Sequence, residues 1–287
     1  MQGTVDGFSY GLVTPLVAYL MACLGGALGL RCTTRAMLVA HSWRPGWLAL
    51  GAAAIGSGIW TMHFVAMMGF TVRGAPIHYD KPLTYASLGV AILMVGVGIF
   101  IVGYKGASGT ALFTGGTLTG LGIASMHYLG MASLELNGQL EYNTLTVGFS
   151  VVIAMAAATA ALWAAGQVRG LVWSVGASLV MGLAVTGMHY TGMAAMSVHL
   201  HSGAPVAGDS PAALLAPMLI GPLAFLCVAG VVVLFDPLMV MGGPDWTPVE
   251  HKPGVPAHAP APRAGRRPAA RPGRRDLRLE HRTAQNR

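Results

Sequence analysis

The sequence predicts an all-α, polytopic membrane protein, a bundle of seven helices built from three two-helix repeats plus one further helix. Hydrophobic residues make up 54% of the 287 residues and charged residues only 9%, whereas roughly 25% of a soluble domain is charged. Apolar stretches of the roughly 20 residues that cross a bilayer recur between short polar segments. A glycine-rich segment containing Met-His occurs three times. These observations argue against a water-soluble fold.

Seven apolar stretches are expected to span the membrane. Glycine and alanine are frequent in them, which allows neighbouring helices to approach closely. An odd number of spans places the two chain ends on opposite sides of the bilayer. The expected ranges are 8–31, 46–70, 83–104, 109–134, 144–166, 171–196 and 212–235.

The charges between the spans predict the orientation of the chain. The loops after the first, third and fifth spans are basic and contain no acidic residue, and such loops stay in the cytoplasm. Their basic residues are Arg31, Arg35, Arg44, Lys105 and Arg169. The opposite loops are mainly acidic. We therefore expect a multi-pass protein of the inner membrane with its amino terminus outside and its carboxyl terminus in the cytoplasm.

Residues 238–287 differ in composition from the rest of the chain. They consist largely of Pro, Ala, Gly and Arg and cannot build a packed core. We expect a disordered cytoplasmic tail there, following a membrane domain of residues 1–237. Nine of the 17 basic residues are arginines between Arg263 and Arg287, so the net charge of +7 comes largely from this tail. No nucleic-acid partner is expected.

Three segments align without gaps, and each contains a histidine preceded by methionine. Each copy has a glycine seven residues before its histidine and fits the pattern M-H-[FY]-x-[AG]-M. The period of about 60 residues corresponds to one helix pair, so the first six spans form three repeats. The three histidines are His63, His127 and His189.

The three histidines are expected at one depth in the membrane. His63 lies about 16 residues, or roughly 24 Å of helix, beyond the cytoplasmic-side Trp47, in an apolar layer about 30 Å thick. The other two fall at similar distances into their spans. Three imidazoles can then meet in the outer part of the membrane if their helices are neighbours. Ionisable groups at such depth are costly and indicate function.

The helical spacing also predicts that methionine sulfur atoms could bind a metal ion beside the histidines. A methionine four residues after each histidine lies on the same helix face; these are Met67, Met131 and Met193. The methionine directly before each histidine lies about 100° to the side and could serve only a site shared with a neighbouring helix; these are Met62, Met126 and Met188. Met196 lies two turns beyond His189 on the same helix face, so the third copy is expected to carry an additional thioether.

Imidazole combined with thioether predicts copper, particularly Cu(I), because soft sulfur selects that ion. Zinc fits less well, since its protein ligands are Cys, His, Asp and Glu. Non-covalent haem with His/His or His/Met axial ligands is the less favoured alternative. The structural alternatives are packing for the methionines and hydrogen bonding between helices for the histidines.

At these motifs the sequence resembles the MHYT domain, a bacterial seven-helix sensor module named for Met-His-Tyr-Thr. Residues 188–191 match the signature letter for letter, whereas the second copy departs at Leu129 and the first at Phe64 and Val65. The resemblance covers roughly residues 8–235. It implies a copper-binding sensor of oxygen, carbon monoxide or nitric oxide in the bacterial cytoplasmic membrane. Such domains often precede cyclic-di-GMP enzymes, histidine kinases or DNA-binding domains.

The expected function is therefore a sensor or signalling module that has no catalytic activity of its own. It would detect a diatomic gas or a redox state and work through a separate cytoplasmic signalling protein. A copper transporter and a copper or haem membrane oxidoreductase are the alternatives. A transporter should carry ligands at successive depths, whereas these cluster in one layer. An oxidoreductase needs a substrate site or an electron path, and the sequence indicates neither.

The charge pattern makes a prediction about topology. Reporter fusions after Asp209 should read as periplasmic and fusions after Arg169 as cytoplasmic, because basic loops remain inside. Paired alkaline phosphatase and green fluorescent protein fusions measure this directly. The opposite pattern would place the three motifs on the cytoplasmic side.

Overall fold

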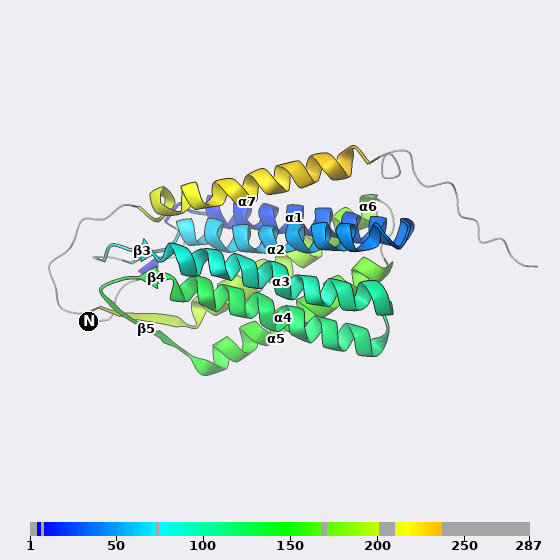
Figure 1. Cartoon of the computed structure of the whole chain (residues 1–287). Helices are drawn as coiled ribbons and strands as arrows, with labels where there is room; N and C mark the ends of the chain where they lie inside the picture. The colour runs from blue at the N-terminus through cyan, green and yellow to red at the C-terminus, as the bar shows by residue number, and fades with distance from the viewer. Residues whose placement is uncertain (1–4, 7–8, 73–74, 168–170, 201–209, 237–287) are drawn as a thin grey trace, which may run out of the picture. The chain divides into compact units, whose positions relative to one another are not determined.

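Seven long helices account for most of the computed structural model, which describes residues 5–6, 9–72, 75–167, 171–200 and 210–236. The seven-helix bundle expected from the sequence is confirmed (Figure 1). The predicted tail, and the domain boundary after residue 237, lie outside the described residues. The helices are α1 (Val13–Leu38), α2 (Arg44–Met68), α3 (Lys81–Lys105), α4 (Gly109–Ala132), α5 (Thr144–Gln167), α6 (Leu171–Ala194) and α7 (Pro211–Leu234).

The first helix departs most from the expected ranges. It runs to Leu38, seven residues beyond the predicted end at residue 31. The polar residues Thr33 and Thr34 do not interrupt it, because their hydroxyl groups donate to the carbonyl groups of Gly29 and Leu30 one turn earlier. Residues 32–38, which were expected to belong to a loop, therefore form the last two turns of the helix.

Six of the seven helices are long and apolar enough to cross a membrane, and α4 is the exception. Its 24 residues include glycines, threonines and His127, which dilute its apolar character. The helix packs along both α3 and α5, and its inward face is built for close contact rather than for lipid. The expectation that this stretch crosses the membrane stays a prediction.

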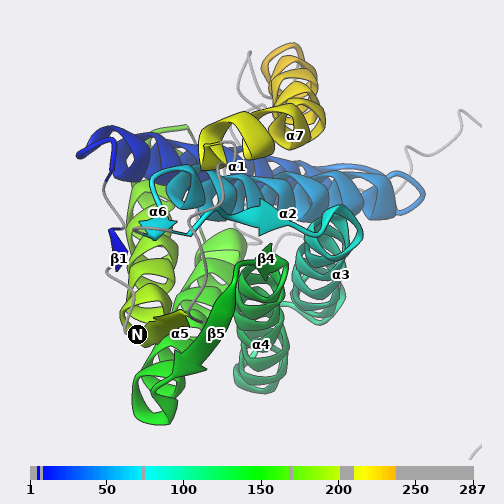
Figure 2. The same ribbon diagram turned by 90° about the vertical axis from the view of Figure 1, so that its left-hand side faces the viewer.

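The first six helices form a closed ring. Each helix packs against the next along the chain, and α6 packs against α1. Helix α7 lies outside the ring against α1 and α2, as both views show (Figures 1 and 2). Inside the ring lies a continuous core of apolar side chains contributed by all six helices. The ring therefore brings α2, α4 and α6 to alternate positions around one centre.

The glycine that starts each sequence motif explains how the ring closes. A Cβ on Gly56 would lie 2.8 Å from Ile92 Cα of α3, and a Cβ on Gly120 would lie 2.6 Å from Met155 N of α5. A Cβ on Gly182 would lie 2.5 Å from Cys23 Sγ of α1. Carbon atoms in contact prefer about 3.5–4.0 Å. Only glycine permits these three crossings, the last of which joins the end of the ring to its beginning.

Short strands, which the sequence pattern did not predict, flank each helix pair at one end of the bundle, the end that faces the viewer in Figure 2. In each repeat a strand before the first helix pairs antiparallel with a strand after the second. The pairs are β1 (Val5–Asp6) with β2 (Thr71–Val72), β3 (His78–Tyr79) with β4 (Leu134–Glu135), and β5 (Gly138–Tyr142) with β6 (Met196–Leu200). The repeat unit is thus strand–helix–helix–strand.

An ion pair connects α1 with the residues that follow α7, at the opposite end of the helices from the strands. Arg35 Nε donates to Asp236 Oδ2 at 2.7 Å, and both side chains are largely buried. The guanidinium also lies 5.5 Å from the ring centroid of Trp47 in α2. Asp236, two residues beyond the end of α7, is therefore joined to the ring through Arg35 of α1.

The glycine crossings make a prediction about stability. Gly120→Ala should destabilise the fold by about 1–3 kcal/mol, the usual effect of overpacking, because its Cβ would overlap the α5 backbone. Gly148→Ala on α5 is the matched control, since nothing lies within 4 Å of a Cβ there. Thermal unfolding of the detergent-solubilised protein measures the difference. Equal unfolding temperatures for the two variants would contradict the assigned role of Gly120.

Candidate metal centre

The three motif histidines meet at the centre of the helix ring. Each lies five residues before the last residue of its helix, α2, α4 or α6, which confirms the predicted common depth. Their Nδ1 atoms form a nearly equilateral triangle. The separations are 3.0 Å between His63 and His189, 3.1 Å between His127 and His63, and 3.3 Å between His189 and His127.

The histidine cluster is buried and nearly threefold symmetric. The three rings are at most 1% exposed. Their centroids lie 4.9 to 5.1 Å apart, and each pair of ring planes is close to perpendicular, at 82° to 87°. Each imidazole therefore directs one nitrogen edge at the common centre rather than stacking on its neighbours.

The Nε2 side of two of the rings, those of His63 and His127, rests on a neighbouring helix. A Cβ on Gly130 of α4 would lie 2.5 Å from His63 Nε2, and Gly192 of α6 approaches His127 Nε2 in the same way. Within the described part of the chain, these two Nε2 atoms have no hydrogen-bond partner. In the second and third copies, the glycine three positions after the histidine is thus the surface against which another copy's histidine packs. The sequence pattern identified this small residue but not the histidine that packs against it.

The aromatic residue after each histidine supports the ring beside it. Phe64, Tyr128 and Tyr190 place their ring centroids 4.6, 4.8 and 4.9 Å from those of their own histidines, all nearly edge-on. Tyr128 donates to Ser150 Oγ of α5 at 2.7 Å, because the Ser150 hydroxyl itself donates to the carbonyl group of Val147. These contacts agree with the packing role that the sequence favoured for the aromatic residues.

The methionines of the motifs are inside the protein. Met62, Met126, Met188 and Met67 are fully buried, and Met131 is 1% exposed. Met193 is only partly buried. Their assignment as thioether ligands stays a prediction.

The expectation for Met196 is wrong. Helix α6 ends at Ala194, and Met196 begins β6, where it pairs with Tyr142. The backbone N–H of Asn143 donates to the carbonyl group of Ala195 and holds the chain in its turn toward the strand. Met196 therefore does not continue the helical face of His189.

Phenol groups cover the cluster on the strand side. Tyr79 lies with its ring centroid 6.3 Å from that of Phe64, and Tyr142 lies 5.9 Å from Tyr128. Burial raises the pKa of Tyr79 and raises the pKa of Tyr142 to about 12, with Tyr128 adding to the second shift. Both phenols are neutral at physiological pH. They add no charge that would compete with a cation at the histidines.

Three Nδ1 atoms at this spacing favour a bound cation. A neutral imidazole carries its proton on one ring nitrogen and a lone pair on the other. Three nitrogens in a triangle cannot all be satisfied by each other, because an Nδ1–H can point at only one neighbour and two facing N–H groups repel. With the protons on Nε2, all three lone pairs point to the centre. A cation there would satisfy all three, which is the preformed arrangement of a three-histidine metal site.

A family model matches the chain three times, in phase with the histidine motifs. The model is MHYT, described as "Bacterial signalling protein N terminal repeat", and it matches residues 56–115, 120–178 and 182–240. Each match begins at a motif glycine and so joins a histidine-bearing helix to the helix that follows it. No solved structure matches the chain significantly.

Characterised relatives are signalling proteins longer than this chain. "Bifunctional diguanylate cyclase/cyclic di-GMP phosphodiesterase MucR" of Pseudomonas aeruginosa is 37% identical over 79% of this chain and 34% of its own length. "Cyclic di-GMP phosphodiesterase NbdA" of the same organism is 33% identical over 71% and 27%, respectively. "Signaling protein YkoW" of Bacillus subtilis is 29% identical over 69% and 25%. The chain spans about a third or less of these relatives.

The contact between Gly130 and His63 makes a prediction about metal binding. Gly130→Ala should displace the His63 ring and weaken metal affinity by about 10- to 100-fold, the usual effect of disturbing groups that orient a ligand. Gly187→Ala, two residues from His189 with nothing within 4 Å of its Cβ, should leave the affinity unchanged. Competition of the purified protein with a Cu(I) chelator measures both. Equal affinities for the two variants would show that metal binding by His63 does not depend on its contact with Gly130.

Proposed function

Because the chain belongs to the MHYT family, we propose that it is a membrane sensor that holds copper at His63, His127 and His189. The MHYT domain is a sensor and signalling module. We propose as its input a diatomic gas, O2, CO or NO, or a change of redox state. The proposed output is a contact with a cytoplasmic signalling protein. The proposed location is the bacterial inner membrane, with the histidine end outward.

One observation carries the copper proposal, namely the convergence of three buried Nδ1 atoms within 3.3 Å of one another. A metal about 2.0–2.1 Å from each of three imidazole nitrogens requires them roughly 3.3–3.6 Å apart. The triangle is within a few tenths of an ångström of that spacing. A small outward movement of the rings would accommodate the ion.

The donor set favours copper over the other candidates. Three histidines alone also suit zinc, but thioether groups one helical turn from each histidine favour Cu(I). Met67, Met131 and Met193 remain the proposed thioether ligands, and Met62, Met126 and Met188 could contribute from the sides. Haem fits the cluster poorly, because three nitrogens this close leave no room for a macrocycle between them.

The surroundings of the cluster argue against a copper transporter. One helical turn below the histidines, toward the opposite end of the ring, the corresponding positions hold Ile59, Ile123 and Val185, all 3% exposed. None of these side chains can bind a metal ion. A transported ion would have to leave its three ligands for a purely aliphatic layer. A resident ion has no such requirement.

We further propose that this part of the signalling system has no catalytic activity. About two-thirds or more of each relative named as a cyclase or phosphodiesterase lies outside the region shared with this chain, and the matched repeats are the sensor part. When bound, copper would supply a coordination position for a diatomic ligand and a change of oxidation state. The chain's own residues hold the imidazoles in place and exclude water.

The ligand assignment predicts the effect of removing the histidines. Replacing His63, His127 and His189 together by alanine should abolish copper retention. The protein should remain helical, because membrane helices satisfy their own backbone hydrogen bonds. Metal analysis and circular dichroism of the protein purified in detergent measure both. As a control, His41→Ala removes a histidine outside the motifs and should retain copper.

Two outcomes would overturn the proposal. A triple-histidine variant that binds copper at the wild-type stoichiometry would leave packing as the better account of the motif. Loss of a Soret absorption band, rather than of copper, would assign haem to the same residues.

A further inference from the structure

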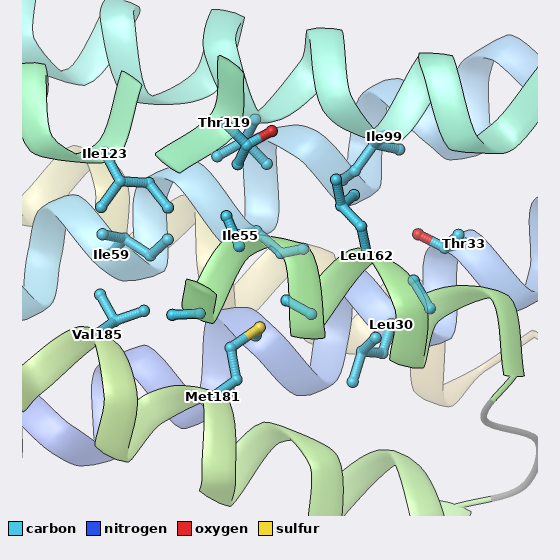
Figure 3. A pocket seen from close by; sticks show the side chains of 15 residues that line it. Leu30, Thr33, Ile55, Ile59, Ile99, Thr119, Ile123, Leu162, Met181 and Val185 are labelled. Carbon is cyan, nitrogen blue, oxygen red and sulfur yellow. The ribbon is translucent and has the colours of Figure 1, made fainter. Parts of the chain in front are cut away.

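A small apolar cavity lies in the middle of the helix ring. Its volume is about 30 Å³, and its 15 lining residues come from all six helices of the ring. Figure 3 shows the lining side chains directed inward from the surrounding helices. The cavity is separate from the histidine cluster, and the sensor function does not by itself explain why the ring is hollow there.

The cavity lies directly beneath the three histidines. Ile59, Ile123 and Val185, each four residues before a histidine, line one side of it. Residues four apart lie on one helix face, so these side chains form the layer just below the imidazoles. Leu30 and Leu162 lie on the opposite side of the cavity (Figure 3). One layer of aliphatic side chains separates the cavity from the cluster.

The lining is suited to an uncharged, apolar guest. It contains no ionisable residue, and its two polar side chains are Thr33 and Thr119. Both hydroxyl groups donate to backbone carbonyl groups, those of Gly29 and Met94. Water in a buried site needs two to four polar partners, and apolar cavities without them stay dry and bind apolar guests such as xenon. Water therefore has little reason to occupy this site.

The size of the cavity selects a very small guest. One water molecule requires roughly 10–15 Å³ measured in this way, so about 30 Å³ accommodates a molecule of two or three non-hydrogen atoms. Four lining residues are alanines of α5, and their small side chains create the space; they are Ala157, Ala158, Ala161 and Ala165. An apolar gas prefers such surroundings to water.

From these observations we propose that the cavity is a binding site for an uncharged diatomic gas, placed one helical turn below the histidine cluster. The identification of the guest as a diatomic gas rests on the proposed function. It adds that the gas is held on the membrane-centre side of the cluster, where it has dissolved from the apolar interior. The aliphatic layer of Ile59, Ile123 and Val185 is then the barrier between the stored gas and the histidines.

Xenon tests the cavity without any metal. The protein is labelled at isoleucine methyl groups, placed in lipid nanodiscs and titrated with xenon pressure while methyl NMR shifts are recorded. Ile59 and Ile123 should show saturable shifts, because they line the cavity. Ile77 is equally buried but lies outside it, so its signal should not move. Shifts of equal size at all three residues would contradict the proposal.

Substitutions on α5 provide the matched variants. Ala158→Phe fills the cavity and should abolish the xenon shifts of Ile59 and Ile123. Ala160→Phe introduces the same side chain on the exposed face of the same helix and should preserve them. Should Ala158→Phe fail to fold, Leu162→Ala enlarges the cavity and should lower the xenon pressure at half-saturation. Persistent shifts in folded Ala158→Phe, or an unchanged half-saturation pressure in Leu162→Ala, would overturn the inference.

The test separates this inference from the proposed function. Wild-type protein that binds no copper but shows the xenon shifts would refute the copper sensor and leave the gas cavity standing. Protein that retains copper at its histidines but shows no saturable shift would refute only the cavity.

Discussion

The close crossing of neighbouring helices at three glycines is the constraint on which the rest of the structure depends. Gly56, Gly120 and Gly182 let each histidine-bearing helix approach the next helix of the ring until backbone and side chain touch. The third crossing, against Cys23, joins the sixth helix to the first. Without that closure α2, α4 and α6 would not surround one centre, and three histidines at equal depth would face three different neighbours.

The sequence predicted the features that depend on composition and period. Apolar length located all seven helices, and the motif period placed His63, His127 and His189 at one depth. The sequence did not predict the features that depend on contacts between distant parts of the chain. Strands of two residues carry no alternation to detect, and Met196 leaves the helix because β6 pairs with β5. The partner of Gly130 depends on which helices are neighbours in the ring, and no local pattern contains that information.

The groups described around the histidine cluster carry no charge. Aliphatic side chains lie below it, neutral phenols lie toward the strands, and glycine backbone lies against two of its Nε2 atoms. Metal-binding histidines usually donate their second N–H to a carboxylate, a carbonyl group or water. For His63 and His127 the described residues supply no such partner. The ligand field at this centre would therefore be set by the position of the rings more than by polarisation from outside.

The closed ring has the contact pattern of a cyclic trimer whose three subunits have been joined into one chain. In a homotrimer every subunit would contribute an identical imidazole, and any substitution would appear three times. Fusion into one chain removes that restriction. The first copy carries Phe64 and Ala66 where the others carry tyrosine and glycine. A nearly symmetric set of ligands therefore lies in an asymmetric environment, and the three imidazoles are chemically distinguishable from one another.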